Sequence, residues 1–424
     1  MSLEASESET TEVRTLKRPK RKVAILFGYD GKDFAGLQQQ PKSQSVTTIE
    51  DLLLGALVEV GAISVDNGTN VEKNSWTRSG RTDRGVSAAR QLISCKIMLE
   101  DPRAMVQKLN AVLPSDIRVW DIIPTPKNFN ARRTCDSRKY EYALPTYVFR
   151  DPPPAAYYGP NSEAPPLPVS DEDITMIQLP ISQPTLEDID CDRRFRATAE
   201  QIATFRAIMT SFQGVHNFHN FTLGRSFKDK ASVRRMIQIQ VLDPEVHDGV
   251  EWLRVRLHGQ SFMLHQIRKM IGLASLMVRT QTPISIIPET LTSVKLNIPK
   301  APGTGLLMDE PLFQSYNTAD KRRIESGKDP IDFSLAAEDI EKFKQHILAG
   351  IRQDEMVNHR FGRWARFIDS YSFTFATYLN RDGIVRPCYI LGLPLRDSSV
   401  DIKDVVDVGN GDDGQQCDEQ DQND

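Results

Sequence analysis

A carboxylate between two guanidinium groups stands at the centre of the segment Ser79–Val86, whose sequence is SGRTDRGV. The two glycines of this segment favour a tight loop. Because nearby positive charge favours the charged form of an acid, Arg81 and Arg84 would keep Asp83 ionised. An ionised carboxylate can act as a nucleophile or a general base. A surface turn with exchangeable ion pairs is the alternative, and composition alone does not decide between the two.

A second charge, Arg268, lies in an apolar stretch with the sequence GQSFMLHQIRKM, residues 259–270. We expect residues 261–279 to form a helix, which would place Leu264 one turn before Arg268. A guanidinium group beside an apolar face needs a partner. Asp83 is chemically suitable for that pairing, and a purely structural ion pair is the alternative.

Several familiar cofactor and metal motifs are missing from the sequence. It contains neither GxxxxGK[ST] nor GxGxxG, so we expect no nucleotide or dinucleotide cofactor. His216 and His219 have the HxxH spacing of a metal pair, but no acid or cysteine stands at a supporting spacing, so zinc is the less favoured interpretation. The five cysteines are widely scattered, which predicts reduced thiols. We therefore expect no cofactor and no metal.

Hydrophobic periodicity predicts the elements that must position these residues. Short apolar runs and alternation indicate strands at 23–28, 92–98, 117–123, 138–147, 232–242 and 250–258, and helical spacing indicates helices at 48–60, 102–112, 197–209 and 261–279. The strand at 138–147 alternates as a half-buried strand does. The pattern of strands and helices recurs after residue 192, which predicts an α/β (α+β) protein of two α/β halves, with a ligand site between them.

Composition divides the chain into five parts. We expect a disordered basic arm at 1–22, an N-terminal catalytic half at 23–150, a Pro-rich insertion at 151–192, a C-terminal half at 193–395 and a disordered acidic tail at 396–424. The net charge of −4 includes ten acids and one lysine in 397–424 and four acids and six bases in 1–22, so +3 remains for the body. A mildly basic body is compatible with binding to nucleic acid. The sequence shows neither a membrane span nor a signal peptide, so we expect no membrane partner and a place inside the cell.

Five segments resemble the motifs of the tRNA pseudouridine synthases of the TruA family. In chain order they are YDGKDFAGLQQQ (29–40), SGRTDRGVSA (79–88), CDSRKYEY (135–142), HNFHNFT (216–222) and GQSFMLHQIRKM (259–270). The last two, with the Pro-rich insertion, the basic arm and GLLMDEPLFQSYN (305–317), resemble the eukaryotic pseudouridine synthase 1-like branch. The resemblance spans Val23 to about Tyr316 and leaves both tails uncovered. Ser87 is a departure, because bacterial members usually carry His there, and we expect it to affect local packing or RNA contact.

The resemblance implies a pseudouridine synthase fold, in which two α/β halves share a mostly antiparallel sheet around a central basic cleft. It implies that Asp83 is the catalytic nucleophile and that Arg268 pairs with it. Arg81 would help to bind RNA and set the loop, and Tyr140 would stack on the target uracil and is a candidate base. Uridine isomerisation has no net redox change, hydrolysis or external group, so it requires no cofactor.

Basic residues around the loop would contact the RNA, which is recognised largely through shape and backbone. Some lie near Asp83 or lead into the strand of Tyr140, and others cluster after the HNFHNFT segment. The RNA-binding candidates are Arg84, Arg132, Arg133, Arg138, Lys139, His219, Arg225, Arg234 and Arg235.

The sequence therefore predicts an isomerase that converts uridine to pseudouridine in tRNA, with mRNA and snRNA as further candidate substrates and a monomer as the favoured state. A non-catalytic RNA-binding or tRNA-chaperone protein on the same fold is the alternative. Whether the carboxylate attacks C1′ of the ribose or C6 of the base stays open. The run Lys17–Lys22 (KRPKRK) predicts the nucleus, with the cytoplasm as a second location, and the four glutamates before Arg14 argue against a mitochondrial presequence.

Overall fold

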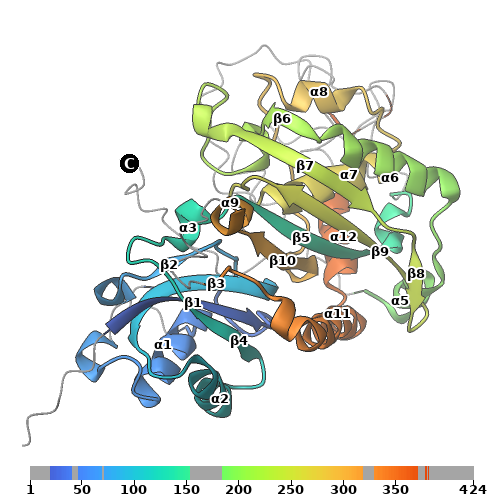
Figure 1. Ribbon diagram of the computed structural model, residues 1–424. Coiled ribbons are helices and arrows are strands. Elements are labelled where there is room, and N and C mark those ends of the chain that lie inside the picture. The colour runs from blue at the N-terminus through green and yellow to red at the C-terminus, as the bar shows by residue number, and fades with distance from the viewer. Residues whose placement is uncertain are drawn as a thin grey trace, which may run out of the picture.

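A single sheet runs through both halves of the chain in the computed structural model (Figure 1). The structure describes residues 20–40, 46–68, 71–152, 184–318, 329–370, 378–379 and 381. The ten strands follow the order β4-β1-β3-β10-β5-β9-β7-β6, with β2 added on β3 and β8 on β9. Their bounds are β1 Lys20–Tyr29, β2 Thr77–Arg78, β3 Ser87–Met98, β4 Ile117–Pro124, β5 Ser137–Pro145, β6 Gly214–Asn217, β7 Val233–Val241, β8 Glu245–His247, β9 Val250–Gly259 and β10 Leu306–Leu312.

Strand β10 joins the two halves of the sheet. It runs parallel to β3 and antiparallel to β5, which belongs to the N-terminal half in sequence but pairs along its other edge with β9 of the C-terminal half. The other pairings between described strands are antiparallel. The expected architecture of two halves that share a mostly antiparallel sheet is therefore confirmed.

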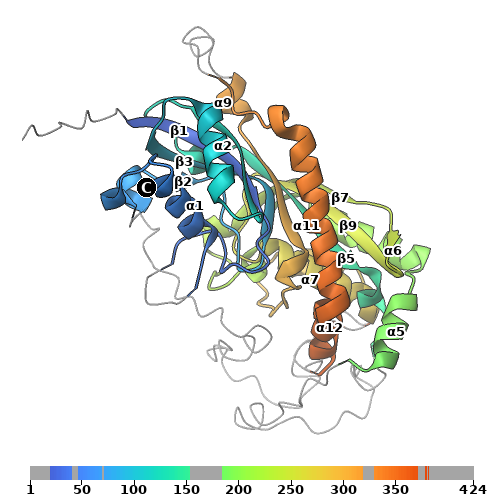
Figure 2. The same ribbon diagram turned by 90° about the horizontal axis from the view of Figure 1, so that it is seen from below.

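The helices cover the sheet in separate groups. Figure 1 shows α1 and α2 beside the N-terminal strands and α6 and α7 beside the C-terminal strands, and Figure 2 shows α11 running along the sheet into α12. Trp120 of β4 packs edge-to-face on Phe343 of α11, with ring centroids 5.5 Å apart. The bounds are α1 Ile49–Glu59, α2 Pro102–Val112, α3 Ala131–Thr134, α5 Leu186–Arg194, α6 Ala199–Ser211, α7 Gln266–Thr280, α8 Ile286–Thr290, α9 Gln314–Thr318, α11 Ala337–Asn358 and α12 Arg360–Ser370.

Helix α7 begins later than its periodicity predicts. His265 has a left-handed backbone, with φ of 61°, so the helix starts at Gln266 rather than at residue 261. Leu264 consequently lies in the preceding loop, where it is 40% exposed, and does not cover Arg268 from one helical turn away. All fifteen residues of α7 are buried, including the polar residues Gln266, Arg268 and Lys269.

Three other expectations are corrected by the fold. Strand β1 starts at Lys20, inside the segment 1–22 that we expected to be a disordered arm, and Lys22 is buried and donates to the carbonyl of Ser75 at 2.7 Å. Helix α5 occupies the end of the insertion 151–192. Strand β5 is buried along most of both faces rather than on one. The expectations for residues 1–19, 153–183 and 396–424 fall outside the described residues.

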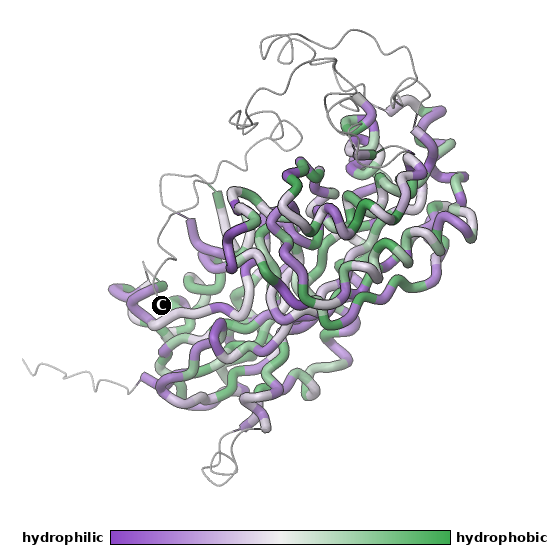
Figure 3. Tube along the Cα trace, turned by 90° about the horizontal axis from the view of Figure 1, so that it is seen from above, coloured by the Kyte–Doolittle hydropathy of each residue, from purple (hydrophilic) through white to green (hydrophobic). Residues whose placement is uncertain are grey.

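The hydrophobic core follows the strands of the shared sheet, where Figure 3 shows the hydrophobic stretches gathered. Cys95 and Cys135 are buried free thiols, and Cys191 is a free thiol at the surface. Among the helices that the structure describes, none has the length and apolar composition required to cross a membrane.

Candidate active site

The loop that carries Asp83 connects β2 to β3. At its start, the Ser79 amide donates to the carbonyl of Leu92 at 2.9 Å. The Ser79 carbonyl accepts from Nε and Nη2 of Arg138 at 2.9 Å and 2.6 Å. Because Arg138 also donates to the Gln260 carbonyl at 3.0 Å, it ties the loop to the segment that precedes α7.

The segment 29–37 holds the other side of this loop. The hydroxyl groups of Tyr29 and Thr82 lie 2.7 Å apart, and the Leu37 amide donates to the Thr82 carbonyl at 3.2 Å. Gly36 has φ of +94°, and a Cβ at that position would lie 2.9 Å from the Thr82 carbonyl oxygen. The glycine at the end of YDGKDFAG is therefore required for the close approach of two backbones. Segment 29–37 therefore supports the loop that carries Asp83.

Ser87 begins β3 directly after the loop and belongs to the same support. Its hydroxyl accepts from the Gly31 amide at 2.9 Å and donates to Asp30 at 3.1 Å. The side chain is buried. We expected serine in place of the bacterial histidine to affect either local packing or RNA contact, and these contacts support local packing.

Asp83 faces two nitrogen groups from α7 and its N-terminal flank. Its Oδ2 lies 3.6 Å from Nη1 of Arg268 and 3.5 Å from Nε2 of His265. The Arg268 side chain is 3% exposed and the Asp83 side chain is 24% exposed. Nε of Arg268 donates to the Ala301 carbonyl at 2.8 Å, which fixes the guanidinium group. The structure thus brings the predicted pair together and leaves the carboxylate open to solvent and ligand.

His265 is the residue at this site that the sequence analysis missed. Its pKa is lowered to about 3, chiefly by burial and further by the positive charges of Arg268, Lys300 and Lys269. The imidazole is therefore neutral at physiological pH. Its Nδ1 is buried without a hydrogen-bond partner in the described part of the chain, which favours the tautomer that carries its proton on Nε2, toward Asp83. A helical interpretation of residues 261–279 hid this role, which depends on the left-handed backbone of His265.

Tyr140 lies on β5 beside the loop and is buried. Its ring packs edge-to-face on Phe262, with centroids 5.0 Å apart. A Cβ on Gly80 would lie 3.7 Å from the Tyr140 hydroxyl, so the phenol reaches the start of the loop. Burial raises the pKa of Tyr140 to about 12, and the Arg138 charge acts against this rise. The phenol therefore keeps its proton at neutral pH, which favours a stacking role over that of a ready base.

The predicted RNA contacts occupy several different environments. Arg81 and Arg84 are exposed on either side of Asp83, and Arg132, Arg133 and Arg235 are exposed as well. Lys139 pairs with Glu310 at 3.0 Å and Arg225 with Asp229 at 2.6 Å. Arg138 differs most from the expectation, because its guanidinium donates to backbone carbonyls. Arg234 donates to the Val233 carbonyl at 2.8 Å and also to the Ala231 carbonyl, and His219 is buried.

The two histidines with HxxH spacing have different partners. Nε2 of His216 lies 2.8 Å from the carbonyl of Gln213, and His219 packs edge-to-face on Phe227 with centroids 5.5 Å apart. Within the described residues, no group of three or more His, Cys, Asp or Glu side chains is arranged to hold a metal ion.

Comparison with known proteins gives a consistent result. Residues 208–313 match the family model described as tRNA pseudouridine synthase. The tRNA pseudouridine synthase 1 of Candida glabrata is 39% identical over 85% of this chain and 72% of its own length. The Saccharomyces cerevisiae protein of the same name is 40% identical over 76% of this chain and 66% of its own length. The Pseudouridylate synthase 1 homolog of Mus musculus is 32% identical over 84% of this chain and 76% of its own length.

Proposed function

The chain belongs to the tRNA pseudouridine synthase family and is an isomerase of uridine in tRNA, and we propose that Asp83 is the nucleophile of the reaction. The supporting observation is the environment of its carboxylate, which lies 3.6 Å from the buried guanidinium of Arg268 and is 24% exposed. A carboxylate beside a fixed positive charge stays ionised. Its remaining exposure leaves room for a nucleotide to approach.

The reaction breaks the C1′–N1 bond of uridine, rotates the uracil and forms a C1′–C5 bond, after which C5 loses its proton and N1 carries one. Asp83 can attack either C1′ of the ribose or C6 of the base, and both routes balance. Tyr140 offers a flat ring on which the detached uracil can stack, an interaction worth ~1–3 kcal/mol per base. The target base must first leave its stack, as it does in other base-modifying enzymes.

The remaining site residues support the same reaction. Arg268 and His265 hold the carboxylate from the side of α7, and Arg81 and Arg84 flank it on the loop, where they can contact RNA phosphates. This assembly favours catalysis over a purely RNA-binding role, because such a role has no use for a carboxylate among phosphate-binding cations.

The test is the substitution Asp83→Asn, since an amide has almost the shape of a carboxylate without its nucleophilicity. We expect tRNA affinity within about threefold of wild type and turnover reduced by more than about 10³-fold, an effect typical of the loss of a nucleophile. Release of tritium from tRNA labelled at C5 of uridine measures turnover. Asp33→Asn is the matched control, because it removes an exposed charge from the neighbouring segment. Turnover by Asp83→Asn at the level of this control would refute the assignment.

We further propose that the protein acts as a monomer in the nucleus, with the cytoplasm as a second location, and that mRNA and snRNA are additional substrates. The support for nuclear entry is the basic run Lys17–Lys22. Because Lys22 is buried in β1, the import test should leave it intact and place alanines at the other basic positions of the run. A fusion with those alanines should lose its nuclear concentration, and pseudouridine mapping in cells that lack the protein should reveal the RNA targets.

A further inference from the structure

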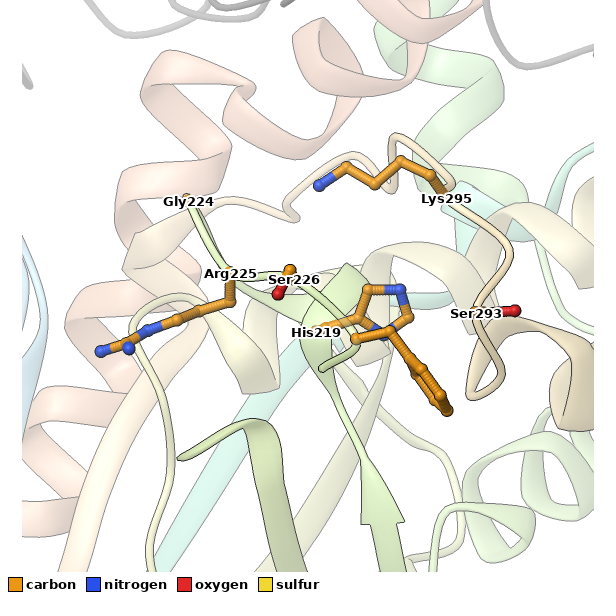
Figure 4. Close-up of a pocket in the computed structure, with 7 residues that line it drawn as sticks. His219, Gly224, Arg225, Ser226, Ser293 and Lys295 are labelled. Carbon is orange, nitrogen blue, oxygen red and sulfur yellow. The ribbon is translucent and has the colours of Figure 1, made fainter. Parts of the chain in front are cut away.

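A pocket lies beside the loop that follows the HNFHNFT segment (Figure 4). Its volume is about 430 Å³, within the range of ~300–1,000 Å³ common for ligand sites. The proposed reaction makes no use of this pocket. It is lined by His219, Gly224, Arg225, Ser226, Phe227, Ser293 and Lys295.

Asn220 fixes the two walls of the pocket to each other. Its side-chain amide donates to the carbonyls of Thr290 and Val294 at 2.9 Å and 2.7 Å. Its Oδ1 accepts from the Leu296 amide at 3.0 Å. These bonds attach the segment that carries Lys295 to the turn that carries His219. The pocket is therefore formed before a ligand arrives, which lowers the entropic cost of binding.

The lining combines a cation with an exposed aromatic ring. Figure 4 shows the Lys295 side chain extending over the space that His219 borders, whereas Arg225 points away from it. Arg225 is also paired with Asp229. Burial, and then the charge of Lys295, lowers the pKa of His219, so this ring is neutral and Lys295 supplies the positive charge. Phe227 is 41% exposed, and its ring meets His219 edge-to-face, so ring surface is available for stacking.

The pocket is connected to Asp83 through the first turn of α7. Lys269 follows Arg268 in that turn, and its ammonium group donates to the carbonyls of Asn220 and Thr222 at 3.3 Å and 3.2 Å. Burial lowers the pKa of Lys269 to about 8, with further contributions from Lys295 and Lys300. Positive charge therefore extends from the carboxylate of Asp83 to the pocket.

We propose that this pocket binds a nucleotide of the tRNA substrate that flanks the target uridine, with its phosphate at Lys295 and its base on Phe227. A cation beside an exposed aromatic ring is the combination that single-stranded nucleotides require. The hydroxyl groups of Ser226 and Ser293 add neutral donors for phosphate oxygens. The proposal rests on the proposed function, since it takes tRNA as the ligand, but it does not depend on which residue is the nucleophile.

The test compares Lys295→Ala and Phe227→Ala with wild type in binding of fluorescently labelled tRNA. Lys295→Ala should weaken binding several-fold and reduce the slope of log affinity against log salt by roughly 0.7–0.9, the contribution of one phosphate. Phe227→Ala should weaken binding about tenfold. Phe227→Tyr should bind as wild type does, because it keeps the aromatic face that stacking requires. Single-turnover rates at saturating enzyme should stay within about twofold of wild type, since neither residue touches the reacting atoms.

The controls separate this proposal from its alternatives. Lys342→Ala removes an exposed lysine that is paired with Glu338 on α11, and it should leave the affinity and the salt slope unchanged. Unchanged melting temperatures would show that the variants are folded, as expected for exposed positions. Folded Lys295→Ala and Phe227→Ala that both bind tRNA as wild type does, with the same salt slope, would overturn the proposal. An active Asp83→Asn variant would overturn the catalytic assignment alone.

Discussion

The protonation state of His265 makes a quantitative prediction about stability against pH. In the folded protein the pKa of His265 is about 3, compared with 6.5 for an ordinary histidine. Between these values the unfolded chain binds a proton that the folded chain does not bind. The contribution of His265 to stability is therefore fully present above pH 6.5 and is lost as the pH falls toward 3. Each pH unit below 6.5 costs about 1.4 kcal/mol, so the loss at pH 5 is about 2 kcal/mol.

The substitution His265→Gln removes this titration and keeps an N–H donor for Asp83. We expect the variant to be less stable than wild type at pH 7.5, because glutamine packs less well at this buried position. The difference in the free energy of unfolding should shrink by about 2 kcal/mol between pH 7.5 and pH 5. Only wild type loses stability over this range through His265, because its unfolded chain binds a proton there that its folded chain does not. Urea unfolding of both proteins at several pH values measures this difference.

Two features of the site act in opposite directions on this histidine. The Asp83 carboxylate, 3.5 Å away, favours an imidazolium, whereas burial and three neighbouring cations favour the neutral ring. We give more weight to burial, because the His265 side chain is 7% exposed and the positive charges outnumber the single acid. A difference between variant and wild type that stays constant or widens toward pH 5 would refute this reasoning. The same titration in an Asp83→Asn background would then show whether the carboxylate causes the discrepancy.

The other predictions concern a buried cation, a buried acid and the dependence on ions. Arg268→Leu should lower the free energy of unfolding by ~1.5–3 kcal/mol, the value of a hydrogen bond made by a charged group such as the one from Nε to the Ala301 carbonyl. The loss should stay below the ~3–5 kcal/mol of a fully buried ion pair, because water reaches Asp83. Urea unfolding and tritium release should both record the loss, and an unchanged variant would contradict the pairing. Burial raises the pKa of Glu355 to about 7, so ionisation of this side chain lowers the stability of wild type as the pH rises from 4.5 to 7. If Glu355→Gln is less stable than wild type at pH 4.5, the difference in the free energy of unfolding should shrink over that range. A difference that grows instead would contradict the sign. Turnover should persist in EDTA on tRNA shown to remain folded, and tRNA affinity should fall with salt with a slope steeper than about −3. Loss of turnover that zinc but not magnesium restores would point to the histidine metal site instead.

Local signals decided which elements could be predicted from the sequence. Helix α2 has the predicted bounds, because Asp101 caps it and Pro102 begins it. Helix α1 matches closely for the same reason, since Thr48 and Asp51 form a capping box at its start. Both signals lie within three residues of the helix end, so they require no knowledge of the fold.

Contacts between distant segments decided which elements could not be predicted. The apolar spacing of α7 continues back to Phe262, before the start of the helix. The helix nevertheless begins only at Gln266, because His265 has a left-handed backbone. Strand β10 has two adjacent acids and a proline within seven residues, Leu306–Leu312, so it lacks the alternation of a strand. Its place in the sheet comes from pairing with β3 and β5, which are more than 150 residues away in sequence.

The central position of β10 explains why the candidate site is built from both sides of the shared sheet. Asp83 comes from the loop before β3, and Tyr140 lies on β5, on the other side of β10. Met308 of β10 is opposite Ala88 of β3 and Tyr140 of β5, so one residue aligns the two sides of the site. Arg268 is held from the segment just before β10, through the carbonyl of Ala301. A site assembled in this way is complete only when β10 has paired with both neighbours, so the Asp83 environment depends on the shared sheet.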